Sequence, residues 1–144
     1  MGLIAVQLTS VSLVFGLAMA RDPAPVLAQP LHLSVWLGLV LTFGLTVVAA
    51  CTLAGAPGHH VGTPVSGAVV PILGWSREVG DLRVAHVLAT HALHVLPLVG
   101  LVAARLWPAG SGLRAVWAAG GLWAALTTAT LAQALAGQPL IPPG

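Results

Sequence analysis

Long uncharged stretches dominate the hydrophobic pattern, and four of them have the length of a membrane span. We predict helical spans at about residues 3–20, 31–53, 84–104 and 113–136. The third is the clearest, because the 21 residues between Arg83 and Arg105 carry no formal charge. At about 1.5 Å of rise per residue, they match the roughly 30 Å hydrocarbon thickness of a bilayer. The pattern therefore predicts an all-α fold, a bundle of four transmembrane helices forming one integral membrane domain over residues 1–144.

Helix-breaking residues separate the predicted spans. Residues 21–25 (Arg-Asp-Pro-Ala-Pro) and residues 107–112 form short turns, whereas residues 55–80 contain six glycines and three prolines. This composition predicts a Gly/Pro-rich loop between the second and third helices. Asp81 then stands where the N-cap of the third helix is expected. The first 20 residues end in a small-x-small pattern, but no Lys or Arg precedes the apolar run, so we expect a retained helix rather than a cleaved signal peptide.

Composition supports this assignment and excludes several classes of function. The chain is 58% hydrophobic and only 6% charged, with five basic residues, all arginine, and three acidic ones. So few charges exclude a nucleic-acid-binding surface. The single cysteine, Cys51, excludes an internal disulfide and any multi-cysteine metal site. We expect a multi-pass protein of the bacterial cell (inner) membrane with the lipid bilayer as its first partner.

Three histidines in the third span are the most informative polar residues. An imidazole in hydrocarbon is costly unless it ligates, pairs or faces a polar interior, so His86, His91 and His94 are candidate cofactor-binding residues. At about 100° per residue, His94 lies roughly 80° and His91 roughly 140° around the helix from His86. The three cannot all address one point, so further ligands must come from elsewhere.

The histidines outside the third span narrow the choice of metal ligands. The first and fourth spans contain no histidine, and His32 is expected at the opposite membrane face from His86. His59, in the loop sequence GHHVG, shares the membrane face of His86. We therefore predict a metal site formed by His59, His86 and His91. Neutral imidazole is a suitable ligand for haem, another metal or a chlorophyll-type pigment, and these residues do not indicate which of the three is bound.

Residues 56–98 carry a resemblance to known proteins. Their GHHVG and GWSREVGDLRVAHVLATHALHVLPL segments are similar to a group of small bacterial four-helix membrane proteins with a G-D-L-R-x-x-H-x-x-x-x-H core. This resemblance implies that His59, His86 and His91 match, and it implies no activity. The layout also loosely resembles membrane b-type cytochromes, which place haem ligands on two facing helices. This chain lacks that pairing within one half of the membrane.

These observations favour a histidine-site membrane protein that binds haem, another metal or a chlorophyll-type pigment and takes part in membrane electron or energy transfer. The alternative is an accessory structural subunit of a larger respiratory or photosynthetic membrane complex, because small side chains suit close helix contacts. A homo-oligomer would supply missing ligands from a second copy. A transporter or quinone-reactive enzyme ranks third. The chain shows no nucleophile and base pair, no paired carboxylates and no phosphate loop, so we do not expect an enzyme.

Overall fold

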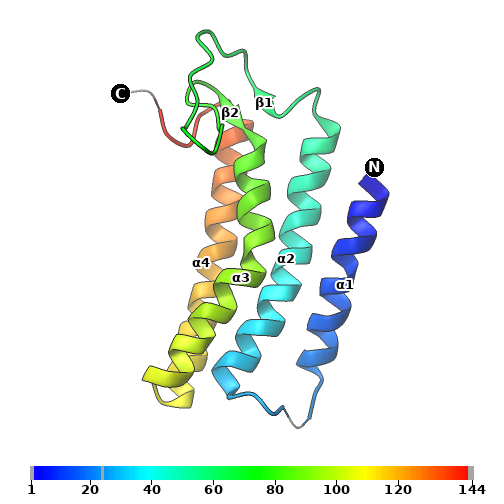
Figure 1. The fold of residues 1–144 in the computed structure, drawn as a ribbon, viewed down its shortest axis with the longest axis vertical. Coiled ribbons are helices and arrows are strands. Elements are labelled where there is room, and N and C mark those ends of the chain that lie inside the picture. The colour runs from blue at the N-terminus through cyan, green and yellow to red at the C-terminus, as the bar shows by residue number, and fades with distance from the viewer. Residues whose placement is uncertain (1, 24, 143–144) are drawn as a thin grey trace.

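Four helices make up most of the protein, and the computed structural model describes residues 2–23 and 25–142 (Figure 1). The elements are, in chain order, α1 (Gly2–Ala20), α2 (Gln29–Gly55), β1 (His60–Val61), β2 (Gly80–Asp81), α3 (Leu82–Leu106) and α4 (Ala109–Leu135). The predicted, mostly helical architecture is confirmed. Three helices, α2, α3 and α4, are long and apolar enough to cross a membrane, which indicates a membrane protein. In α1, the stretch Thr9–Ala20 is apolar but shorter than a span.

Local sequence explains where the helices begin and end. Pro30 lies in the first turn of α2, where its missing N–H removes no helical hydrogen bond. Asp81 caps α3 as predicted, because its Oδ1 accepts a hydrogen bond of 3.1 Å from the backbone N–H of Arg83. Arg105 lies in the last turn of α3, where a positive charge is favourable at the carboxyl end of a helix.

The packed core lies between α2, α3 and α4, while α1 packs against the other side of α2 (Figure 1). Fully or nearly fully buried core residues come from all three inner helices: Leu33, Leu37, Leu96, Ala103 and Val116. On α3, small residues recur every three or four positions and are completely buried, among them Ala85, Ala89 and Ala92. Such a small-residue stripe lets two helix backbones approach closely, which is how membrane helices pack.

Glycines mark the closest approaches between helices. A Cβ on Gly100 of α3 would lie 1.8 Å from Ser34 Oγ and 2.8 Å from the Pro30 carbonyl oxygen of α2. A Cβ on Gly120 of α4 would lie 2.8 Å from Leu37 Cδ2. These positions therefore hold glycine because the neighbouring helix occupies the space that a side chain would need.

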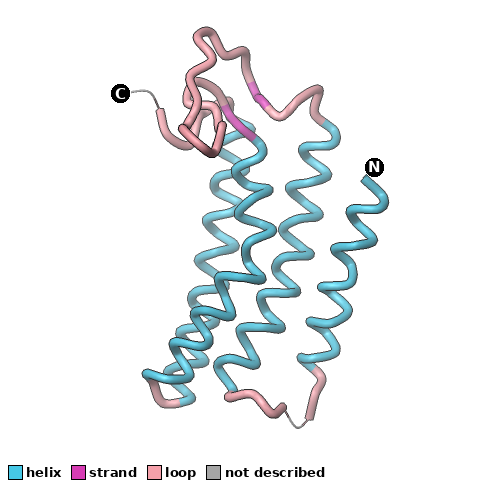
Figure 2. Tube along the Cα trace, in the orientation of Figure 1, coloured by secondary structure: helices cyan, strands magenta, loops and turns pink. Residues whose placement is uncertain are grey.

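The segment between α2 and α3 folds over one end of the bundle, at the end where α1 begins and α4 ends (Figure 2). Its two short strands pair antiparallel, with His60 opposite Asp81 and Val61 opposite Gly80. The backbone N–H of Leu82 adds a hydrogen bond of 2.9 Å to the His59 carbonyl oxygen. The beginning and end of the 26 residues that join α2 to α3, residues 56–81, are thus fastened together at the start of α3.

Candidate functional site

The three histidines of α3 divide between two environments. His91 and His94 are exposed on the outside of the helix, and their ring centroids lie 5.4 Å apart. His86 is half-buried, and within the described residues its buried Nδ1 has no hydrogen-bond partner. This split follows from the helical rotation of roughly 140° between positions 86 and 91.

His91 has one ring nitrogen engaged and one free of the helix. Its Nδ1 lies 2.8 Å from the carbonyl oxygen of Val87, one turn earlier, and 3.4 Å from the hydroxyl of Thr90. A carbonyl oxygen can only accept, so the 2.8 Å contact requires the proton on Nδ1. Nε2 of the neutral ring then carries the lone pair, which makes it the nitrogen available to a ligand.

The predicted trio of metal ligands is not assembled within one chain. His59 is exposed, and its ring lies against that of His60, with centroids 4.1 Å apart. Among the residues described, no three His, Cys, Asp or Glu side chains gather closely enough to hold a metal ion. The structure therefore does not bring together His59, His86 and His91, because the loop histidines turn toward the start of α3 and His91 faces outward.

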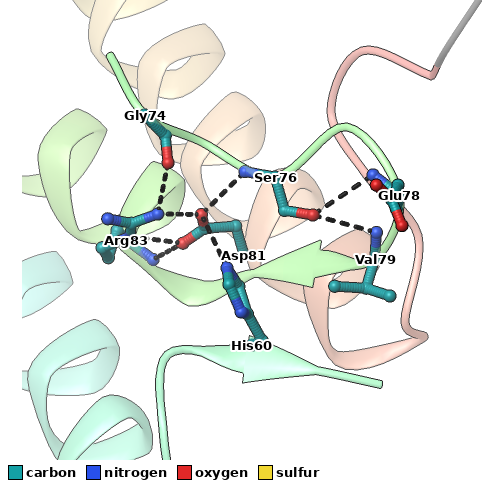
Figure 3. A network of polar contacts seen from close by, with 7 residues as sticks. All are labelled: His60, Gly74, Ser76, Glu78, Val79, Asp81 and Arg83. Atoms are coloured by element: carbon teal, nitrogen blue, oxygen red, sulfur yellow. Dashed lines mark hydrogen bonds and ion pairs between the residues drawn. The ribbon is translucent and has the colours of Figure 1, made fainter. Parts of the chain in front are cut away.

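A polar network centred on Asp81 lies at the start of α3, and its contacts with the preceding loop go beyond the helix cap predicted for this residue (Figure 3). The carboxylate is buried, and it accepts hydrogen bonds from Arg83 Nε at 2.9 Å and Arg83 Nη2 at 2.6 Å. It also accepts a bond of 3.0 Å from the Ser76 backbone N–H. Arg83 Nη2 donates a further bond of 2.6 Å to the Gly74 carbonyl oxygen. His60 completes the group, with Nε2 at 3.8 Å from Asp81 Oδ2.

Electrostatics keep Asp81 ionised at neutral pH. Burial by itself raises the pKa of Asp81, but hydrogen bonds from the Arg83 side chain and from the backbone N–H groups of Ser76 and Arg83 outweigh it, so the pKa lies below its usual value. Desolvation lowers the pKa of His59, and the nearby positive charge of Arg83 lowers it further. A guanidinium already neutralises the carboxylate, so this end of the protein is poorly suited to holding a cation.

A second carboxylate, Glu78, organises the loop that precedes the network. It accepts hydrogen bonds from the backbone N–H of Ser66 at 3.0 Å and of Ala68 at 2.6 Å, from the backbone N–H of Val65, and from the Ser66 hydroxyl. These hydrogen bonds lower the pKa of Glu78 to about 2. The bond from the Ser66 hydroxyl has the largest effect, followed by those from the backbone N–H groups. Ser76 Oγ accepts from the backbone N–H groups of Glu78 and Val79, both at 3.2 Å. A serine shortly before an acidic residue is a local turn signal that could have indicated this arrangement.

One small cavity lies beside the network, between the start of α3, the end of α4 and the carboxyl-terminal segment. Its lining consists of Asp81, Val84, Thr130, Gln133, Ala134, Gln138 and Leu140, and its volume is about 10 Å³, roughly enough for one water molecule. Ligand pockets typically occupy roughly 300–1,000 Å³. The cavity contains none of the predicted histidine ligands and is too small for a tetrapyrrole.

Comparison with known proteins adds no constraint, because no protein-family model, curated protein or solved structure matches the chain. The class of protein therefore follows from the structure alone. It is a mostly helical protein with three helices able to cross a membrane, a hydrogen-bonded polar network at one end, and two imidazoles on the outer face of α3.

Proposed function

We propose that this chain is a multi-pass protein of a bacterial inner membrane, with α1 as a fourth span, that binds a tetrapyrrole on the outer face of α3 and takes part in electron or energy transfer. The observation that carries the proposal is the state of His91. Its ring is exposed near the middle of a spanning helix, and its Nδ1 is occupied by the Val87 carbonyl oxygen at 2.8 Å.

The hydrogen bond to Val87 is the kind of contact that prepares a histidine to ligate a metal. Histidines bound to metals usually donate their other ring N–H to a carbonyl or carboxylate, which fixes the tautomer and the ring orientation. In the neutral form of His91 the same bond places the lone pair on Nε2. His91 is accordingly the residue that would hold the group.

A tetrapyrrole fits this donor set better than a bare metal ion. A structural zinc or similar ion needs about four protein ligands, and the described chain gathers no group of three candidate side chains. A haem brings its own ring nitrogens and needs only one or two protein ligands, a proximal histidine being common. A chlorophyll-type pigment makes the same demand on the protein. When bound, the group would supply redox or light-absorbing chemistry that the side chains lack.

The other histidines take lesser roles in this proposal. His94, whose ring lies 5.4 Å from that of His91, is on the same outer face and is placed to contact the edge of a bound ring. His86 faces the neighbouring helices, and His59 lies outside the spans, so neither is retained as a ligand of this site.

The test uses the protein purified in mild detergent and titrated with haemin, or separately with a magnesium tetrapyrrole. We expect a shifted visible absorption band with one of them, and loss of that shift in His91→Ala with the helical circular dichroism unchanged. His59→Ala is the matched control, since it removes an imidazole outside the site and should leave the spectrum intact. No spectral change with either tetrapyrrole, or a band that persists fully in His91→Ala, would refute the proposal.

A second candidate function is an accessory subunit of a larger membrane complex. The specific observation is an exposed stripe on α3 that includes His91, His94, Leu98 and Val102. Two imidazoles facing lipid at this depth would be costly, so a protein partner covering the stripe also explains them. In that case a larger partner or a second copy should co-purify with the chain. His91→Ala and His94→Ala should then weaken the assembly without any spectral change.

A further inference from the structure

Residues 69–76 form a hairpin with an exposed apolar tip. Val69 and Ser76 pair antiparallel, Val70 N–H donates to the Trp75 carbonyl oxygen at 2.8 Å, and Gly74 N–H donates to the Val70 carbonyl oxygen at 2.9 Å. At the tip, Ile72 is fully exposed and Leu73 is 52% exposed. The rest of the chain leaves these two apolar side chains uncovered, so their surroundings decide whether the exposure is favourable.

The backbone at the tip adopts a conformation that is unfavourable for the residue it contains. Ile72 has a φ of 70°, in the left-handed region that β-branched residues rarely adopt. A residue in this region persists only where its surroundings fix it. The surroundings here are the hairpin hydrogen bonds and the network at the start of α3. The fold of the loop therefore fixes Ile72 in this exposed position.

The position of the tip decides what covers it. The Gly74 carbonyl oxygen, next to Leu73 in the chain, accepts a hydrogen bond of 2.6 Å from Arg83 Nη2. Arg83 belongs to the first turn of α3, a helix able to cross a membrane. An arginine at the end of such a helix extends its guanidinium to the membrane interface. The hairpin is therefore tethered at the level where α3 enters the bilayer.

We propose that the tip, Ile72 and Leu73, inserts into the boundary between lipid headgroups and acyl chains at this face of the membrane. Lipid is the occupant that a spanning α3 places beside the tip, and interfacial membrane anchors bury their apolar side chains in the boundary between headgroups and acyl chains. The inserted hairpin would hold the loop between α2 and α3 close to the membrane surface. This inference rests on the proposed membrane insertion and is independent of the tetrapyrrole.

The test places one spin label at a time in a Cys51→Ser background, in the full chain reconstituted into phosphatidylcholine nanodiscs. Ile72→Cys samples the tip. Thr63→Cys samples an exposed polar position of the same loop, and Leu122→Cys samples an exposed position in the middle of α4. Collision with dissolved oxygen reports lipid, and collision with a water-soluble nickel chelate reports water.

We expect the ratio of oxygen to nickel collisions at position 72 to exceed that at position 63 several-fold and to approach that at position 122. An equal ratio at positions 72 and 63 would overturn the proposal. Protection of position 72 from both reagents would also overturn it, because a second protein copy would then cover the tip. A water-like result at position 122 would instead refute the membrane insertion of α4, which separates failure of the wider proposal from failure of this one.

Discussion

The contact between α2 and α3 at Gly100 makes a quantitative prediction. Gly100 is buried, and a Cβ there would lie 1.8 Å from Ser34 Oγ, 2.4 Å from Ser34 Cβ and 2.8 Å from the Pro30 carbonyl oxygen. The last two atoms belong to or adjoin the backbone of α2, so side-chain rotation alone cannot make room. Gly100→Ala should force the two helices apart.

The magnitude follows from two opposing effects. Replacing glycine by alanine in a helix interior favours the helix by up to about 1 kcal/mol. Overpacking a tight contact typically costs about 1–3 kcal/mol, and contacts as short as these belong at the upper end. We therefore expect Gly100→Ala to lower the free energy of unfolding by about 2 kcal/mol, the difference between about 3 kcal/mol of overpacking and about 1 kcal/mol of propensity gain.

Gly121→Ala in α4 is the matched control, because nothing lies within 4 Å of the position of its Cβ. It gains the same helix propensity without the contact, so it should be neutral or stabilising. Both variants can be compared with the parent chain by unfolding in detergent, followed by far-ultraviolet circular dichroism. The double variant Ser34→Gly, Gly100→Ala should recover part of the loss, because it removes two of the three close atoms. If Gly100→Ala and Gly121→Ala change stability equally, the α2–α3 contact is not as the structure has it.

Three further predictions concern the loop and its network. Because the pKa of Glu78 is lowered from 4.5 to about 2, its hold on residues 65–68 should be complete above about pH 4.5 and lost as the pH falls through 2. The protection factor of the Ala68 amide, which compares its exchange rate with the intrinsic rate at the same pH, should fall accordingly. In Glu78→Gln this protection factor should already be low at neutral pH. Gly80→Ala should displace the last turn of α4 and lower the unfolding temperature, since its Cβ would lie 1.9 Å from the Ala134 carbonyl oxygen. Gly110→Ala, with no atom nearby, should not. Asp81→Asn should cost about 1–3 kcal/mol and expose the loop to proteases, because it weakens the buried, charge-assisted hydrogen bonds to Arg83; unchanged proteolysis would contradict this role.

Much of the fold could be predicted from hydrophobic pattern, because uncharged stretches of span length allow little besides helices in lipid. The helices α2, α3 and α4 extend two to four residues beyond the predicted spans at every end except the carboxyl end of α4, which lies one residue earlier. Asp81 could be named as a cap from its position alone. The crossing of α1 stays a prediction, because its described apolar stretch is shorter than a span.

The site could be predicted only in part, for geometric reasons. Helical rotation correctly indicated that His86 and His91 face different directions, but sequence could not show that His91 faces outward and bonds to Val87. The prediction chose His59 over its neighbour His60. The rings of the two lie against each other, and strand pairing opposite Asp81 makes His60 the less exposed of the two. Pairing between residues some twenty positions apart in a glycine-rich loop leaves no periodic signal in the sequence.

The positions of the start of α1 and the end of α4 have a consequence for the membrane topology. The first helix starts, and the last one stops, at the end of the bundle that carries the strand pair (Figure 1). If all four helices traverse the bilayer, the even number of crossings places the start of α1 and the end of α4 on the same side of the membrane as the hairpin. A reporter enzyme that is active on only one side of the membrane would then show the same activity whether it is fused before α1 or after α4. Opposite activities of the two fusions would mean that α1 does not cross the bilayer.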